Sequence, residues 1–146
     1  MNLAREMLEI TQNVRDSNYL SNLEFSDGLG IDGGIDCTAV PDWDGTSFPA
    51  FDFTVDDISN GVVNQNASGM FTNQVGTQTK YSRLITFAPI CADPTDRSST
   101  QVPAGCSCGA APYTEIIGVR AEAEVAWTRK GRNHSLNIYT DLYDWR

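Results

Sequence analysis

The stretch that decides the fold covers residues 117–142 and reads IGVRAEAEVAWTRKGRNHSLNIYTDL. Apolar and polar side chains alternate along residues 117–127, and they alternate again along residues 134–143. This period of two is typical of strands with one buried face. A basic, glycine-containing segment at residues 129–132 separates the two runs, so the sequence predicts a terminal antiparallel hairpin.

A second periodic pattern lies near the N-terminus. Four apolar residues recur at spacings of four, three and four, which places them on one side of a helix: Leu3, Met7, Ile10 and Val14. One leading helix followed by strands predicts an α+β domain. In this arrangement the apolar side of the helix packs on an antiparallel sheet that ends in the hairpin.

The remaining segments complete one domain over residues 1–146, a length that can bury a substantial core. The chain divides into a helix over residues 1–22, a loop rich in glycine and aspartate over 23–50, the first strands over 51–90, an insertion over 91–112 and the hairpin over 113–146. Within the first strands, residues 80–90 are apolar on both faces, which predicts a strand covered on two sides.

The charge of the chain is acidic and unevenly distributed. The formal net charge is −9, and residues 1–60 carry twelve acidic and two basic groups, whereas residues 61–146 carry seven acidic and eight basic groups. An acidic protein repels phosphate backbones, so we expect no nucleic-acid partner. The uneven distribution suits head-to-tail contact between subunits, although an acidic surface that only confers solubility is the simpler interpretation.

Four cysteines indicate the compartment in which the chain folds: Cys37, Cys91, Cys106 and Cys108. Two disulfides in an oxidising compartment explain them better than a zinc site, because Cys106 and Cys108 do not have the spacing of a zinc knuckle. Cys106 and Cys108 are too close to pair with each other. We therefore expect one of them to pair with Cys91 and the other with Cys37.

Oxygen ligands for calcium are present in the glycine-rich loop. Four aspartates lie there among flexible glycines: Asp32, Asp36, Asp42 and Asp44. The pattern lacks the third acidic position and the terminal Glu of an EF-hand. Turn-forming aspartates are the alternative interpretation.

Catalytic chemistry has little support in the sequence. His134 is the only histidine, and its position on the inward side of a predicted strand favours a structural role. The adjacent carboxylates of Asp56 and Asp57 point apart on a strand, which is poor geometry for sharing a proton. The chain has no nucleophile elbow, no phosphate-binding loop and no zinc-protease motif, so we expect no enzyme.

Three stretches of the chain together resemble a known family: residues 9–20 with 27–29, residues 81–86, and residues 119–132 with 142–145. Their order, with a Trp before the basic turn of a closing hairpin, is similar to the soluble head of type IV pilin-like proteins. The nearer resemblance is to minor pilins and to the minor pseudopilins of type II secretion. The resemblance covers about half of the chain and does not include the cysteine-containing insertion.

The resemblance implies a non-enzymatic subunit of a filament in the bacterial cell envelope, periplasmic or extracellular, with other pilin or pseudopilin subunits as partners. It also implies an apolar helix that anchors the protein in the inner membrane before assembly. Because the apolar stripe starts at Leu3 without a clear helix cap, we expect the native reading frame to continue upstream through about twenty apolar residues and a short basic leader. The alternative is a secreted binding or adhesin module with a calcium-ordered loop.

The hairpin offers two candidate contact surfaces. The cationic side chains of Arg129, Lys130 and Arg132 could bind the acidic half of a neighbouring subunit, and a solvated hairpin tip is the simpler alternative. Four aromatic residues could add a contact surface or form only cross-strand pairs: Tyr113, Tyr139, Tyr143 and Trp145.

Overall fold

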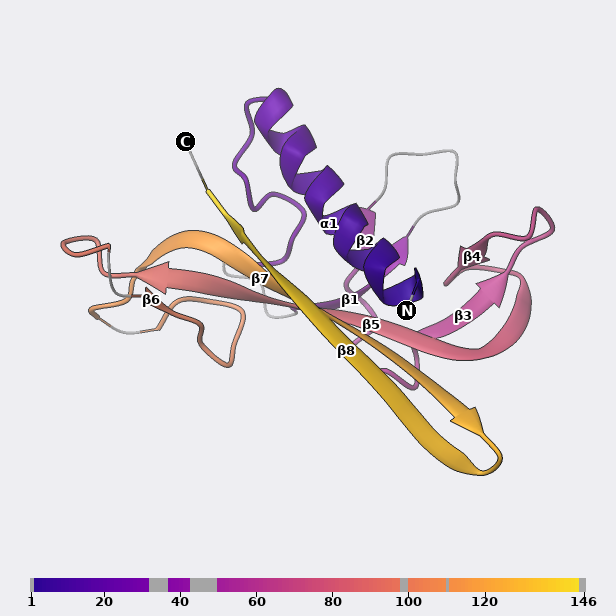
Figure 1. Ribbon diagram of the computed structural model, residues 1–146. Coiled ribbons are helices and arrows are strands. Elements are labelled where there is room, and N and C mark those ends of the chain that lie inside the picture. Colours follow the sequence, from indigo (N-terminus) through magenta and orange to yellow (C-terminus); the bar gives the residue numbers. More distant parts are fainter. Residues whose placement is uncertain (1, 32–36, 43–49, 98–99, 110, 145–146) are drawn as a thin grey trace.

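The structure is a computed structural model that describes residues 2–31, 37–42, 50–97, 100–109 and 111–144 (Figure 1). Within these residues one helix precedes eight strands. They are α1 (Asn2–Leu20), β1 (Thr38–Asp42), β2 (Ala50–Asp52), β3 (Val62–Gln65), β4 (Phe71–Thr72), β5 (Thr77–Ala92), β6 (Thr100–Gln101), β7 (Glu115–Arg129) and β8 (Arg132–Tyr143).

The predicted α+β class is wrong, because the sheet dominates the chain. Strands account for 46% of the described residues, and a single short helix is the only helix among them. β1 lies inside the segment 23–50 that was predicted to be a loop, and β6 lies inside the insertion 91–112. These strands have five and two residues, too few for an alternating pattern to stand out among glycines, aspartates and prolines.

β5 is the central strand of the sheet. One of its edges pairs with β7 from Tyr81–Trp127 to Ala92–Glu115, and β7 pairs in turn with β8. The other edge of β5 pairs in succession with β3, β1 and β6. All of these pairings are antiparallel. The hairpin predicted from residues 117–142 is therefore present as β7 and β8, and β5 contains the strand that was predicted over residues 80–90.

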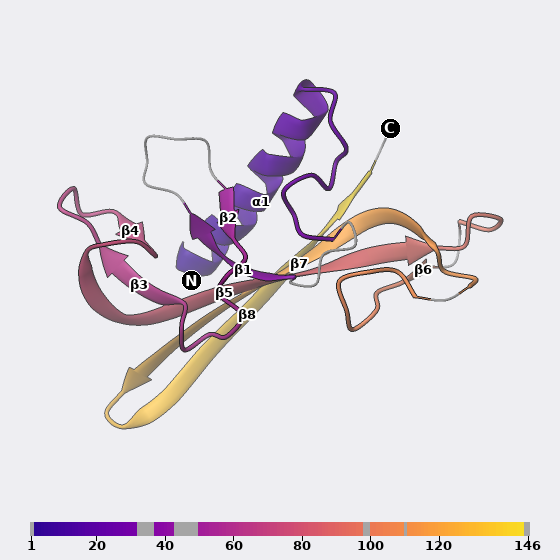
Figure 2. The ribbon, with the colours of Figure 1, turned by 180° about the vertical axis from the view of Figure 1, so that it is seen from behind.

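Helix α1 lies across one face of the long strands, as Figures 1 and 2 show from opposite sides. The predicted stripe faces the sheet: Met7, Ile10 and Val14 are buried, and Leu3 packs against the core. Ala4 and Thr11 are buried as well. Because side chains alternate along a strand, every second residue of β7, from Val119 to Val125, points into the same core.

The C-terminal end of α1 is closed by a specific turn. Asn22 has a positive φ of 55°, and the Leu23 amide donates a hydrogen bond to the Asn18 carbonyl oxygen at 2.9 Å. The buried Asn18 side chain donates to the carbonyl oxygens of Phe25 and Asp27 at 3.2 and 2.8 Å. These bonds hold the segment after α1 against the core, where Phe25 and Leu29 are buried.

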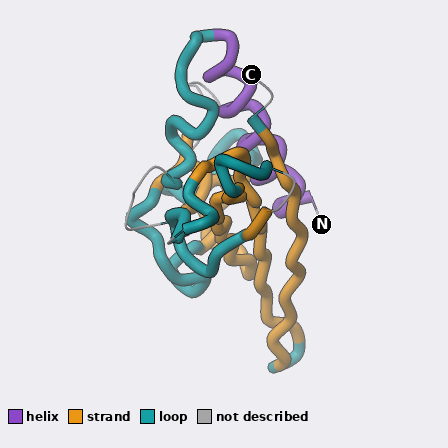
Figure 3. Tube along the Cα trace, turned by 90° about the vertical axis from the view of Figure 1, so that its left-hand side faces the viewer, coloured by secondary structure: helices purple, strands orange, loops and turns teal. Residues whose placement is uncertain are grey.

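The hairpin β7–β8 extends beyond the helix and ends in a two-residue turn (Figure 3). Lys130 and Gly131, the two central residues, both have positive φ values, 52° and 73°. A turn of this kind matches the right-handed twist of the strands that it connects. The turn therefore holds the two neighbouring arginines, Arg129 and Arg132, directly opposite each other in the register.

Candidate assembly surfaces

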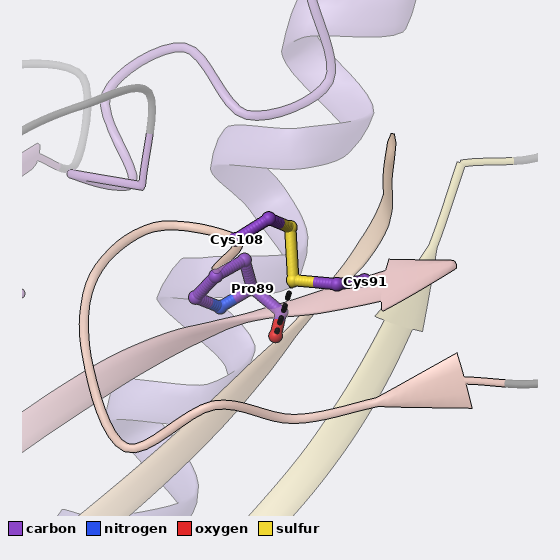
Figure 4. Close-up of a disulfide and its surroundings, with 3 residues drawn as sticks. All are labelled: Pro89, Cys91 and Cys108. Carbon is purple, nitrogen blue, oxygen red and sulfur yellow. Dashed lines mark hydrogen bonds between the residues drawn. A yellow bond between two sulfur atoms is a disulfide. The ribbon is translucent and has the colours of Figure 1, made fainter. Parts of the chain in front are cut away.

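Two disulfides fix the insertion to the sheet. Cys37 pairs with Cys106 across 69 residues, and Cys91 pairs with Cys108 across 17 residues. Both pairs lie within the alternatives expected from the sequence. Figure 4 shows Cys91 on β5 joined to Cys108, with the Cys91 sulfur 3.9 Å from the carbonyl oxygen of Pro89. The insertion is thus attached at one strand and at the segment that leads into β1.

The disulfides also bear on the compartment. Structural disulfides are typical of an oxidising environment, such as the periplasm or the cell exterior. No helix in the described part of the chain combines the length and the apolar character needed to cross a membrane.

Three of the four candidate calcium ligands, Asp32, Asp36 and Asp44, lie outside the described residues. The fourth, Asp42, is at the end of β1, where its carboxylate accepts a hydrogen bond from the Gln74 side chain. Across residues 2–31, 37–42, 50–97, 100–109 and 111–144, no group of three His, Cys, Asp or Glu residues is placed to hold a metal ion. The calcium hypothesis therefore gains no geometric support from Asp42.

His134 lies on the helix-side face of the sheet as predicted, but it is exposed. It stacks on Trp127 with ring centroids 5.5 Å apart, and Trp127 contacts Tyr81 on the next strand at 6.4 Å. The three residues are register partners on β8, β7 and β5. His134 is exposed because it lies near the tip of a hairpin that extends beyond the helix. The alternating pattern therefore predicted the face of the sheet on which His134 lies but not its exposure to solvent.

Asp56 and Asp57 lie in the turn region after β2, so their expected placement on a strand is wrong. Asp56 and Asp57 are both exposed, and Asp57 accepts hydrogen bonds from the hydroxyl and the amide of Ser59 at 2.6 and 2.8 Å. These bonds lower the pKa of the Asp57 carboxyl, and the bond from the Ser59 hydroxyl has the largest effect. Asp57 therefore stabilises its own turn.

A buried cation attaches α1 to the sheet, and the sequence analysis did not identify it as a site. Arg83 on β5 is 1% exposed and donates hydrogen bonds to Asn73 at 2.7 Å and to Glu6 of α1 at 3.1 Å. Burial lowers the pKa of the Arg83 guanidinium, and the Glu6 carboxylate opposes this decrease. An arginine directly before the largely apolar run of residues 84–90 was the signal, because a buried charge requires a partner.

The backbone of Arg83 is in close contact with Gly61. Its amide donates to the Gly61 carbonyl oxygen at 2.8 Å. A Cβ atom at position 61 would lie 2.1 Å from the Arg83 carbonyl oxygen, so only glycine fits there. The segment that leads into β3 is thereby held against β5 beside the buried cation.

The opposite face of the hairpin carries a polar clamp. Arg120 on β7 donates two hydrogen bonds to Asp141 on β8, at 2.7 and 2.8 Å, and its guanidinium lies 4.7 Å from the centre of the Tyr139 ring. The hydrogen bonds from Arg120 lower the pKa of the Asp141 carboxyl. Tyr139 and Tyr143 are 64% and 46% exposed. Two of the four predicted aromatic residues thus form part of the exposed surface, whereas Tyr113 is half-buried and Trp145 lies outside the described residues.

The three basic residues of the turn are all exposed. The four ion pairs among the described residues involve other groups, so the side chains of Arg129, Lys130 and Arg132 make no ion pair within the described chain. The structure thus presents three cations together at the tip of the hairpin.

An apolar groove lies on the helix-side face, next to the first turn of α1. Its volume is about 510 Å³, and its apolar lining includes Leu3, Tyr81 and Trp127. Phe71, which is 41% exposed, also lines the groove, and Lys80 and Arg129 add positive charge to the lining. The groove could hold an apolar segment that carries negative charge.

The chain matches no protein-family model, no curated protein and no solved structure at a significant level.

Proposed function

We propose that this protein is a non-enzymatic structural subunit, a minor pilin or pseudopilin, of a type IV pilus-like or type II secretion filament. The observation that carries the proposal is the attachment of α1. Its buried residues run from Ala4 to Asn18, and its Glu6 is bound to the buried Arg83. A helix attached along its length can transmit force from an N-terminal extension to the sheet.

The exposed groups support the same role. The cations at the hairpin tip and the exposed Tyr139 and Tyr143 are free of the core and suit contacts with neighbouring subunits. The acidic N-terminal half of the sequence supplies the complementary charge. Contacts of this kind are individually weak, and a filament makes them effective by repeating them.

A triple charge reversal tests the proposal in the full-length protein. We expect the variant with Arg129→Glu, Lys130→Glu and Arg132→Glu to enter filaments about tenfold less than the parent protein, a loss equivalent to about 1.4 kcal/mol. Exposed hairpin-tip charges contribute little to folding, so the variant should unfold at the same urea concentration as the parent. The measurement is the fraction of the protein recovered with isolated filaments.

The control for this experiment is Arg97→Glu, which reverses an exposed cation of the insertion. It should leave incorporation within about twofold of the parent, because Arg97 pairs with Glu115 at the start of β7, at the end of this strand opposite the turn. Recovery of the parent protein only as a free molecule in the medium, with none in filaments, would contradict the proposed function and favour the secreted binding module. Normal incorporation of the triple variant would show that the turn is solvated surface only.

A further inference from the structure

The end of α1 opposite the groove carries an exposed apolar feature. Leu20, the last residue of α1, is 90% exposed, and Leu23, shortly after it, is 48% exposed, although the other side of the helix is buried. Two carboxylates lie close by in the chain, on the exposed residues Glu24 and Asp27. The nearby Arg15 is hydrogen-bonded to Asp16, so this region is acidic overall. We call Leu20 and Leu23, with Glu24 and Asp27, the acidic knob.

The acidic knob and the apolar groove have complementary chemistry. The knob presents two leucines beside carboxylates. The groove is lined by aromatic and aliphatic side chains together with the cations Lys80 and Arg129. Burial of leucine side chains against Tyr81 and Trp127 would remove apolar surface from water on both sides. The carboxylates of the knob and the cations of the groove have opposite charges. Their attraction would orient the contact and disfavour docking in the reversed orientation.

The two surfaces are placed at opposite ends of the same helix. α1 has 19 residues, which corresponds to about 28 Å between its ends. Figure 1 shows the C-terminal end of α1 and the tip of the hairpin on opposite sides of the molecule. A contact that uses different surfaces on its two partners repeats from copy to copy, and it generates an open line of subunits when the rotation between copies does not close a ring.

We propose that the acidic knob of one copy of this chain docks into the apolar groove of the next copy, end to end. This inference rests on the proposed filament function and specifies the contact between successive subunits. The occupant of the groove is a second copy of the chain, because the same molecule supplies a feature of matching charge and polarity. The contact is small, so in isolation we expect a dissociation constant of about 1 mM.

Paramagnetic relaxation between two copies of the 146-residue chain tests the contact. One copy carries a spin label at Ser21→Cys beside the knob, and the other is labelled with ¹⁵N and observed at about 1 mM. We expect broadening of the Trp127 indole N–H signal and of the Phe71 amide signal in the observed copy. A label at Asn137→Cys, on the other face of β8, should leave both signals unchanged.

Complementary variants make the test specific. The knob variant carries Leu20→Ser and Leu23→Ser, and the groove variant carries Phe71→Ser and Lys80→Glu. When the labelled copy and the observed copy both carry the same variant, the broadening should decrease at least about tenfold. A mixture of a labelled groove variant with an observed knob variant should restore it, because that pair retains one intact knob and one intact groove. Val75→Ser, at a residue that is 95% exposed and outside both surfaces, is the matched control.

The outcomes separate the contact from the proposed function. Absence of broadening with the parent chain, equal broadening with all variants, or no restoration in the mixture would each overturn the end-to-end contact. None of these results would affect the recovery of the full-length protein in filaments, which tests the function. Conversely, a confirmed contact in a protein that never enters filaments would contradict the function alone.

Discussion

At the scale of single residues, Arg83 is the largest fully buried side chain in the described chain. A buried arginine is tolerable only while its hydrogen bonds and its counter-ion are in place. Asn73 and Glu6 supply both. The side chain of Glu6 is 30% exposed, so water can reach the carboxylate but not the guanidinium, which is 1% exposed. Loss of Glu6 therefore leaves a buried charge without its partner.

We predict that Glu6→Ala lowers the free energy of unfolding by about 2 kcal/mol, less than the full cost of breaking a buried pair because Asn73 remains bound to Arg83. Urea denaturation measures this change. Glu9→Ala, at an exposed position of the same helix, is the control and should change the stability by less than about 0.5 kcal/mol. Equal effects of the two substitutions would show that the ion pair does not attach the helix.

The clamp between Arg120 and Asp141 gives a prediction about pH. The folded state depresses the pKa of Asp141, so this contribution to stability is fully present above the unfolded pKa of about 4 and is lost as pH falls through the folded pKa. We expect Asp141→Asn to lower the free energy of unfolding by about 0.5 to 1 kcal/mol at neutral pH, a small value because both groups are partly solvated.

Chemical denaturation of the parent and of Asp141→Asn between pH 7 and acid measures this difference. The two stabilities should converge as the pH falls below the folded pKa of Asp141, since the parent then loses the charge on its carboxylate. The exposed Asp56→Asn is the control and should follow the parent throughout. A difference that stays constant down to the lowest pH would mean that the clamp acts through packing instead of charge.

At the scale of elements, the hairpin and the helix could be predicted because their periodic patterns are long. Inward-facing and outward-facing side chains alternate along residues 117–127 and again along residues 134–143. The four apolar residues of the helix lie on one side of it. β1 and β6 could not be predicted, since strands of five and two residues form only where β5 offers a partner edge. The fold class was wrong for this reason.

Among the candidate sites too, features set by residues close in the sequence could be predicted, and features set by tertiary packing could not. The pairing alternatives for the cysteines followed from chain geometry alone, whereas the Glu6–Arg83 pair joins residues 77 positions apart and is decided by tertiary packing. The exposure of His134 depends on how far the hairpin extends beyond α1, which no local pattern encodes. The acidic knob and the apolar groove likewise appear only once the two ends of α1 are placed.

The two disulfides should differ in their contribution to stability. Removal of the Cys37–Cys106 bond by Cys37→Ser with Cys106→Ser should cost about 4 kcal/mol, and removal of the Cys91–Cys108 bond in the same way about 3 kcal/mol. The longer separation, 69 residues against 17, restricts the unfolded chain more. Urea denaturation of the two double variants measures both values, and the reverse order would contradict the entropic account.

At the scale of the whole molecule, a helix is attached to one face of a sheet, and the apolar groove and the acidic knob lie near the two ends of that helix. The helix is held by a buried stripe and an ion pair, and the insertion is held by two disulfides. Charge is distributed between an acidic N-terminal half and a cationic hairpin tip. This arrangement supports the proposal of a filament subunit, because α1 and the insertion are both attached to the central strand β5.

The central claim, that this chain is a filament subunit, is tested most directly by mass spectrometry of the N-terminal peptide of the native protein isolated from cells that encode it. We predict a mature N-terminus that continues upstream of Leu3 through about twenty apolar residues, enough to cross a bilayer and to pack in a filament. A mature N-terminus created by a conventional signal peptidase, at a small-residue site directly before this domain, would contradict the account.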